Sequence, residues 1–156
     1  MTEGESPKAI FETNPVFLSS LLGDLKTGKI QLPDFQRGWV WDDERIRGVL
    51  ASVSRSFPIG ALMVLETGGE TRFHPRAVEG VDLPKEVEPE LLVLDGQQRL
   101  TSLFQATIYG RVVATMNVRK QPIKRWFYFD MVRSLASAEV RAVASKSDKT
   151  NDFKIG

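Results

Sequence analysis

The sequence contains no cysteine and only one histidine. The lack of cysteine excludes disulfide bonds, a thiolate nucleophile and any zinc site that needs cysteine ligands. Long apolar runs are also missing, because none approaches the roughly 18 residues of a membrane span. The polar N-terminus does not resemble a signal peptide. We therefore expect a cytoplasmic protein with no membrane partner.

Excess charge of one sign is absent as well, since the formal net charge is +1. The charges are unevenly distributed, however: residues 1–90 carry ten basic and fifteen acidic side chains, and residues 91–156 carry eleven basic and five acidic ones. Such asymmetry indicates that a polyanion contacts the second half of the chain.

Length and composition are those of one globular domain, with 156 residues of which 42% are hydrophobic and 26% charged. We expect residues 1–13 to be flexible and residues 14–130 to form the domain. Residues 131–156 are expected to begin a C-terminal extension that is cut short.

Hydrophobic periodicity predicts an α+β arrangement. Asn14 and Pro15 are expected to open a helix that ends at Gly28, and Asp42 is expected to cap a second helix. Other apolar runs predict short strands, and the chain ends in a weak helical pattern. The predicted strands lie at residues 30–32, 61–65, 91–94 and 126–130, with another starting at Val112, and the weak helix covers residues 131–144.

The most informative stretch is residues 91–101, which read LLVLDGQQRLT. The apolar run predicts a short buried strand, central in its sheet, and Gly96 permits a sharp turn after it. From Leu100 the apolar spacing is helical. A strand, a tight polar turn and a helix N-terminus together present backbone N–H groups to an anion, for which phosphate is the natural ligand.

A purely structural alternative exists for this turn. Asp95 as N-cap, with Gln98 three residues later, would form a capping box and need no ligand. It would not explain Gln97, a further polar residue beside Arg99 at the end of a buried strand.

A second Gln–Arg pair, Gln36 and Arg37, lies on a loop that Pro33 and Gly38 hold in shape. Aromatic residues surround it, and three aromatic residues in seven usually pack together at a corner of the fold. They are Phe35, Trp39 and Trp41.

Residues 111–125 contain five cations and no acid. Because Lys and Arg neutralise phosphates, this stretch predicts contact with DNA. The residues assigned to it are Arg119, Lys120, Lys124 and Arg125. The alternative is a solvated basic surface.

Four motifs together resemble one family. They are LPxFQRxxxW at residues 32–41, PIG at residues 58–60, LDGQQRLT at residues 94–101 and YFD at residues 128–130. From about Pro15 to Asp130 the chain resembles the DGQQR-motif domain at the N-terminus of GmrSD-type modification-dependent restriction proteins. Nuclease-bearing effectors of phosphorothioation-based phage defence carry a similar domain.

The resemblance implies a ParB- and sulfiredoxin-like fold, a small mixed sheet flanked by helices that binds nucleotides. It implies a regulatory domain that binds and hydrolyses a nucleoside triphosphate with Mg²⁺, an NTPase within a restriction or anti-phage defence protein. Its other partners would be DNA, modified or not, and a nuclease domain downstream or on another chain. Sulfiredoxin's catalytic cysteine is missing, which excludes sulfur chemistry, and no HNH-type histidines are present, so this chain alone should not cut DNA.

Roles for the motif residues follow from the chemistry of phosphoryl transfer, which needs positioning and charge stabilisation. Asp95 would hold Mg²⁺ or its waters, Gln97 or Gln98 would orient the attacking water, and Arg99 would neutralise phosphate charge. Arg99 lies off the apolar stripe of its helix, so its loss should affect hydrolysis more than folding. The nucleotide-binding residues would be Gln36, Arg37, Gly96, Arg99 and Thr101.

The competing interpretation is a non-catalytic module. Such a module would either bind DNA through residues 111–125 or sense a nucleotide without hydrolysing it, and would recruit or gate a nuclease. A measurement of phosphate release from the nucleotide distinguishes a hydrolysing enzyme from both non-catalytic modules.

Overall fold

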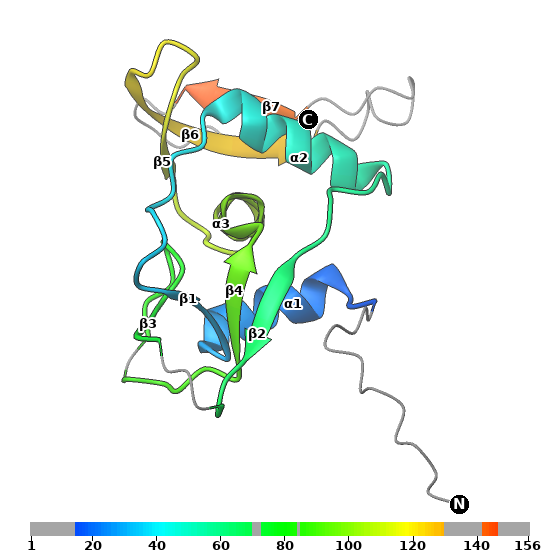
Figure 1. Cartoon of the computed structure of the whole chain (residues 1–156). Helices are drawn as coiled ribbons and strands as arrows, with labels where there is room; N and C mark the ends of the chain where they lie inside the picture. The colour runs from blue at the N-terminus through cyan, green and yellow to red at the C-terminus, as the bar shows by residue number, and fades with distance from the viewer. Residues whose placement is uncertain (1–14, 70–72, 84, 130–141, 147–156) are drawn as a thin grey trace, which may run out of the picture.

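A computed structural model of the chain describes residues 15–69, 73–83, 85–129 and 142–146 (Figure 1). Within these residues three helices accompany two separate β-sheets, which confirms the α+β class but divides the strands between two sheets where one was expected. The helices are α1 (Leu18–Thr27), α2 (Asp43–Ser54) and α3 (Gln97–Thr107).

The first sheet has the strand order β2-β4-β1-β3. Its members are β1 (Ile30–Pro33), β2 (Met63–Glu66), β3 (Pro75–Arg76) and β4 (Leu91–Asp95). β4 runs parallel to β1 and antiparallel to β2, so the sheet is mixed. The prediction of a central strand at residues 91–94 is therefore confirmed.

The second sheet is antiparallel and has the order β5-β6-β7, with β5 (Val113–Met116), β6 (Pro122–Phe129) and β7 (Ala142–Lys146). Figure 1 shows α3 between the two sheets and α2 beside β6 and β7. The weak helix predicted over residues 131–144 is wrong at residues 142–144, because pairing with β6 makes that segment a strand. Residues 131–141 of that prediction lie outside the described residues.

The hydrophobic core joins all three helices to β1 and β4. Apolar residues one helical turn apart, such as Leu22 and Leu25 of α1, turn inward, as their spacing predicts. Other members are Ile46, Leu50, Val93, Leu100, Leu103 and Phe104. This packing fixes the ends of β4 and α3 relative to each other.

Two of the predicted helix boundaries are confirmed, and the predicted start of the first helix differs. Gly28 ends α1 in the left-handed conformation, and Asp42 caps α2 by accepting from Arg45 N at 2.9 Å. α1 begins at Leu18 and not directly after Asn14, which lies outside the described residues. No helix in the described part of the chain is long and apolar enough to cross a membrane.

The strand predicted at residues 61–65 forms at residues 63–66, and its predicted burial is wrong. Met63 is 50% and Val64 41% exposed. β2 is at the edge of its sheet with β4 as its one paired neighbour, so much of its apolar surface stays in contact with solvent.

Candidate functional site

The turn from β4 into α3 depends on Gly96. Its φ of 87° is left-handed, and a Cβ atom there would clash with Leu62 Cδ2 and lie 2.9 Å from Arg99 Nη2. A glycine is therefore required at this position. α3 begins directly after it at Gln97, three residues before the first apolar position of the helical pattern.

Asp95 and Gln98 do not form the capping box that the sequence allowed. Asp95 ends β4, and its exposed carboxylate lies 3.6 Å from Arg99 Nη2. Gln98 donates to Gly38 O at 3.1 Å and accepts from Val40 N at 3.0 Å. The structural alternative is thus wrong, and the N-terminus of α3 has no side-chain cap.

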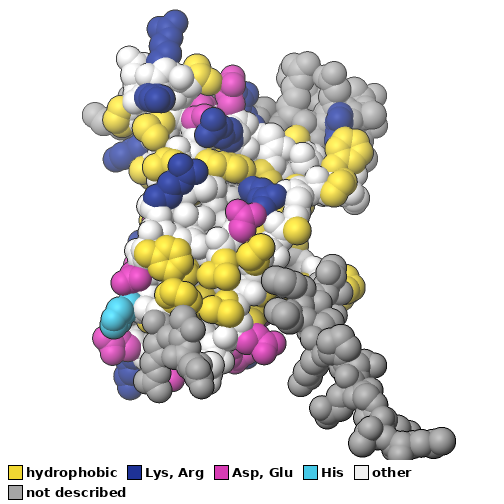
Figure 2. Space-filling view, viewed as in Figure 1, with side chains coloured by type: hydrophobic (Ala, Val, Ile, Leu, Met, Phe, Trp, Pro, Cys, Tyr) yellow, Lys and Arg dark blue, Asp and Glu magenta, His cyan; other side chains and the backbone are white. Residues whose placement is uncertain are grey.

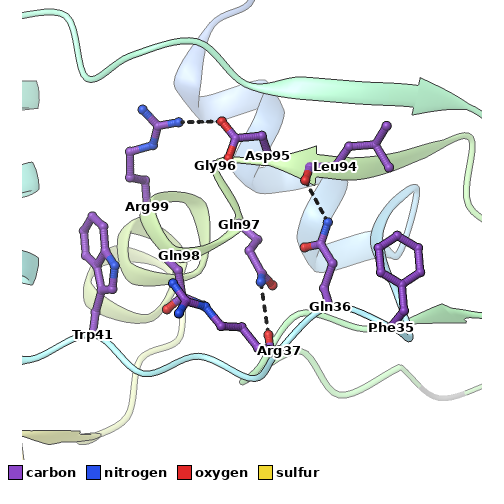
Figure 3. Close-up of a pocket in the computed structure, with 10 residues that line it drawn as sticks. All are labelled: Phe35, Gln36, Arg37, Trp41, Leu94, Asp95, Gly96, Gln97, Gln98 and Arg99. Atoms are coloured by element: carbon purple, nitrogen blue, oxygen red, sulfur yellow. Dashed lines mark hydrogen bonds and ion pairs between the residues drawn. The ribbon is translucent and has the colours of Figure 1, made fainter.

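A cavity of about 450 Å³ opens at this turn and faces the loop that follows β1 (Figure 3). The two Gln–Arg motifs, far apart in the sequence, meet here. The lining residues are Phe35, Gln36, Arg37, Trp41, Leu94, Asp95, Gly96, Gln97, Gln98 and Arg99.

The loop between β1 and α2 is held against β4 and α3 by side-chain amides. Gln36 Nε2 donates to Val93 O at 2.7 Å and Leu94 O at 2.9 Å, and Gln97 Nε2 donates to Arg37 O at 3.1 Å. Gln98, which is 8% exposed, uses both ends of its amide on the loop backbone. The two neighbouring glutamines therefore differ. Gln98 is buried and uses its whole amide to hold the loop, whereas the side-chain oxygen of Gln97 remains at the cavity.

Two residues that the sequence did not single out hold the same loop from its other side. Arg76 Nη2 donates to Gln36 O at 3.3 Å and to Arg37 O at 3.2 Å. Glu79 Oε1 accepts from Trp39 N at 2.9 Å and from Arg76 Nη1 at 3.1 Å. Arg76 ends the two-residue strand β3 and Glu79 lies in the loop after it, where no periodic pattern marks them.

The two arginines of the cavity differ in what they contact. Arg99 Nη1 donates to Ile59 O at 2.5 Å and Nη2 to Ala61 O at 2.7 Å, so this guanidinium holds the loop before β2. Arg37 is exposed, and its guanidinium has no hydrogen bond or ion pair with any described residue. Figure 3 shows them on opposite sides of Gln97, with Arg99 toward Asp95 and Arg37 below Gln98.

The remaining predicted site residues are divided between core and cavity. Thr101 is 1% exposed and lies in the interior, away from the lining residues. Asp95 is the single carboxylate of the lining. The described residues contain no group of three His, Asp or Glu side chains that could hold a metal ion. A Mg²⁺ ion at Asp95 would therefore take its other ligands from phosphate and water, as Mg²⁺ commonly does.

The basic stretch forms one hairpin of the second sheet. Arg119 and Lys120 lie in the turn between β5 and β6, and Lys124 is exposed on β6. Arg125 points inward and pairs with Asp43 of α2 at 3.6 Å. The side chains of the other three have no partner among the described residues. In Figure 2, Lys and Arg side chains gather over the upper part of the molecule, where this sheet lies.

Comparison with known proteins identifies the family. The family described as the N-terminal domain of the GmrSD restriction endonuclease matches residues 18–154. An uncharacterized protein of Methanocaldococcus jannaschii is 33% identical over 135 residues, which is 81% of this chain and 22% of that protein. The chain thus spans about a fifth of the length of the curated relative that it matches.

No solved structure matches the chain, so the relation to ParB and sulfiredoxin stays a prediction. The family match covers both Gln–Arg motifs of the cavity and extends past Asp130 into the segment that contains β7. The chain therefore belongs to the family of GmrSD restriction endonuclease N-terminal domains.

Proposed function

We propose that this domain binds a nucleoside triphosphate in the cavity at the β4–α3 turn and hydrolyses it. One observation carries the proposal: the uncapped N-terminus of α3 opens, at Gly96, into a cavity that also contains Arg37. Backbone N–H groups at a helix N-terminus and an unpaired guanidinium are both strong partners for phosphate oxygens.

The size and walls of the cavity also support a nucleotide. Its volume of about 450 Å³ lies within the range of small-molecule sites. Phe35, which is 63% exposed, lies on one side of the opening and Trp41 on the other, and both offer ring surface to a base (Figure 3). Figure 2 shows a group of hydrophobic side chains over the four-stranded sheet.

Each polar residue of the cavity has a role in such a reaction. Arg37 neutralises phosphate charge, and the exposed carboxylate of Asp95 holds Mg²⁺ or its waters. Gln97 Oε1 receives no hydrogen bond from a described residue, so this oxygen can accept one from the ligand. Gln98 and Arg99 act indirectly, because their hydrogen bonds hold the two loops that border the cavity.

The family supports a place for this activity in a restriction system. Nucleotide binding or hydrolysis would license a nuclease, either downstream in the same chain or on a partner chain. The much greater length of the curated relative leaves room for such a region there. DNA, modified or not, would be the signal that couples nucleotide binding or hydrolysis to the nuclease.

A nucleotide panel tests the proposal. The full-length protein is incubated with each of the four ribonucleoside triphosphates and Mg²⁺, with and without modified DNA, and phosphate release is measured beside equilibrium binding. We expect release with at least one nucleotide. Binding without release would favour the nucleotide-sensing alternative, and absence of both would reject the nucleotide function.

A second candidate function, DNA contact, is favoured by the hairpin. The side chains of Arg119, Lys120 and Lys124 are exposed and have no partner among the described residues. Arg125 is held by Asp43 and so supports the sheet more than it offers charge to a ligand.

Charge reversal at Lys120 and Lys124 should therefore weaken DNA binding and flatten its salt dependence. Each lost phosphate contact reduces the slope of log K against log salt by about one. The matched control reverses Lys26 and Lys85, which are exposed lysines of the other half of the chain. If the hairpin variant keeps the parental affinity and slope, the basic stretch is a solvated surface.

A further inference from the structure

The carboxamides of Gln36 and Gln97 are both oriented by the backbone. Gln36 Nε2 donates to the carbonyls of Val93 and Leu94, and Gln97 Nε2 donates to the carbonyl of Arg37. A carbonyl oxygen can accept only from the NH₂ side of an amide, so these bonds determine which way each amide points. In both residues the oxygen is left for another partner.

Neither oxygen has that partner within the described part of the chain. Gln36 Oε1 is buried and has no hydrogen-bond donor, although buried polar atoms in native proteins are almost always paired. Gln97 Oε1 likewise receives no hydrogen bond from a described residue. Figure 3 shows the two side chains pointing toward each other at the cavity.

The cavity consequently has two ends of opposite character. The N-terminus of α3 and Arg37 supply hydrogen-bond donors, whereas Gln36 and Gln97 supply acceptors beside the apolar walls of Phe35 and Leu94. Phosphate oxygens are themselves acceptors and would be repelled by the second end. The group that binds there must carry an N–H or O–H bond.

We propose that Gln36 and Gln97 form a subsite that recognises a hydrogen-bond donor of the nucleoside, while the phosphates lie at the N-terminus of α3. This inference rests on the proposed nucleotide function and adds the orientation and selectivity of the ligand. The donor is either an exocyclic amino group of the base or a ribose hydroxyl, which share this chemistry. An amino group has the further support that Phe35 and Leu94 offer apolar surface to the base that bears it.

The test compares the nucleotide that binds best with analogues that lack one donor each. The base analogues are purine riboside triphosphate for ATP, inosine triphosphate for GTP and the 4-deamino pyrimidinone nucleotide for CTP. The sugar analogues are the 2′-deoxy and 3′-deoxy forms. We expect one deletion to weaken binding about 10- to 100-fold, because it leaves a buried acceptor unpaired.

Variants identify the acceptors. Gln36→Met and Gln97→Met should each bring the ratio of parent to analogue affinity close to one. Gln97→Glu keeps acceptor oxygens and should retain the preference even if overall affinity falls. Gln121→Met, an exposed position on the hairpin, is the control and should leave the ratio unchanged. Because the ratio is measured within each variant, a general loss of stability does not alter it.

The outcomes separate this inference from the function on which it rests. If the parent nucleotide binds and every analogue binds within about twofold of it, the subsite is rejected and the nucleotide function stands. A preference that survives both Gln→Met substitutions also rejects it. If no nucleotide binds, the proposed function fails, and the subsite fails with it.

Discussion

Replacing Arg37 with alanine should leave the protein folded and reduce nucleotide hydrolysis at least a hundredfold. The side chain is exposed and has no partner among the described residues, so the free energy of unfolding should change by less than about 0.5 kcal/mol. A contact that strengthens in the transition state is worth roughly 3 kcal/mol, which corresponds to more than a hundredfold in rate. Phosphate release and urea unfolding of the same preparation measure both quantities.

Two further variants make this result specific. Arg37→Lys keeps the charge without the planar fork of the guanidinium and should recover only part of the rate. Arg111→Ala removes another exposed arginine, one that pairs with Asp82 at 3.5 Å outside the cavity, and should hydrolyse at the parental rate. A folded Arg37→Ala protein with parental activity would remove this side chain from the proposed mechanism.

Arg99→Ala should have the other large effect, and it should reduce stability and hydrolysis together. The substitution removes charge-assisted hydrogen bonds to Ile59 O and Ala61 O, for an expected loss of about 2–3 kcal/mol. The melting temperature should fall by roughly 5–10 °C. Hydrolysis should fall at least about tenfold, because the turn beside Gly96 is no longer held in place.

This pattern differs from the one expected from sequence alone, in which Arg99 touched the phosphate and mattered little for folding. Differential scanning calorimetry and phosphate release, measured together, distinguish the two roles. Arg99→Lys cannot reach both carbonyls with one ammonium group and should remain destabilised. If Arg99→Ala melts at the parental temperature but loses hydrolysis, Arg99 contacts the phosphate directly. If both the melting temperature and the rate stay parental, Arg99 has neither role.

The parts of the fold that were predictable depend on local signals. From residue 91 to residue 107 the chain has a run of apolar residues, then a glycine with positive φ, then a helical apolar pattern. Each of these signals can be recognised in the sequence without knowing which distant residues it contacts. Gly28 and Asp42 are local in the same way, because a cap depends on residues within one helical turn.

The parts that were not predictable depend on long-range pairing. The exposure of β2 follows from its place at the sheet edge, which no residue of β2 encodes by itself. The segment at residues 142–146 becomes a strand because β6 is there to pair with it. Propensity is a weak guide where tertiary pairing decides the outcome.

The site shows the same division between local and distant information. The two Gln–Arg motifs indicated a polar site, and the structure brings them to one cavity. The different contacts of Arg37 and Arg99 could not be read from their motifs, because the partners of Arg99 are backbone carbonyls. Arg76 and Glu79 were missed for a related reason: they act on loop backbone from the two-residue strand β3 and the loop after it.

The way in which the loop after β1 is held has a consequence for how this domain can diversify. Apart from the contact between Arg76 and Glu79, the bonds made by the side chains of Gln97, Gln98, Arg76 and Glu79 end on backbone atoms of the loop, from Gln36 to Val40. The course of the loop is thus set by these residues together with Gln36, while the side chain of Arg37 takes no part in fixing that course. Evolution or a designer can therefore replace Arg37 with a different side chain and keep the same conformation of the loop.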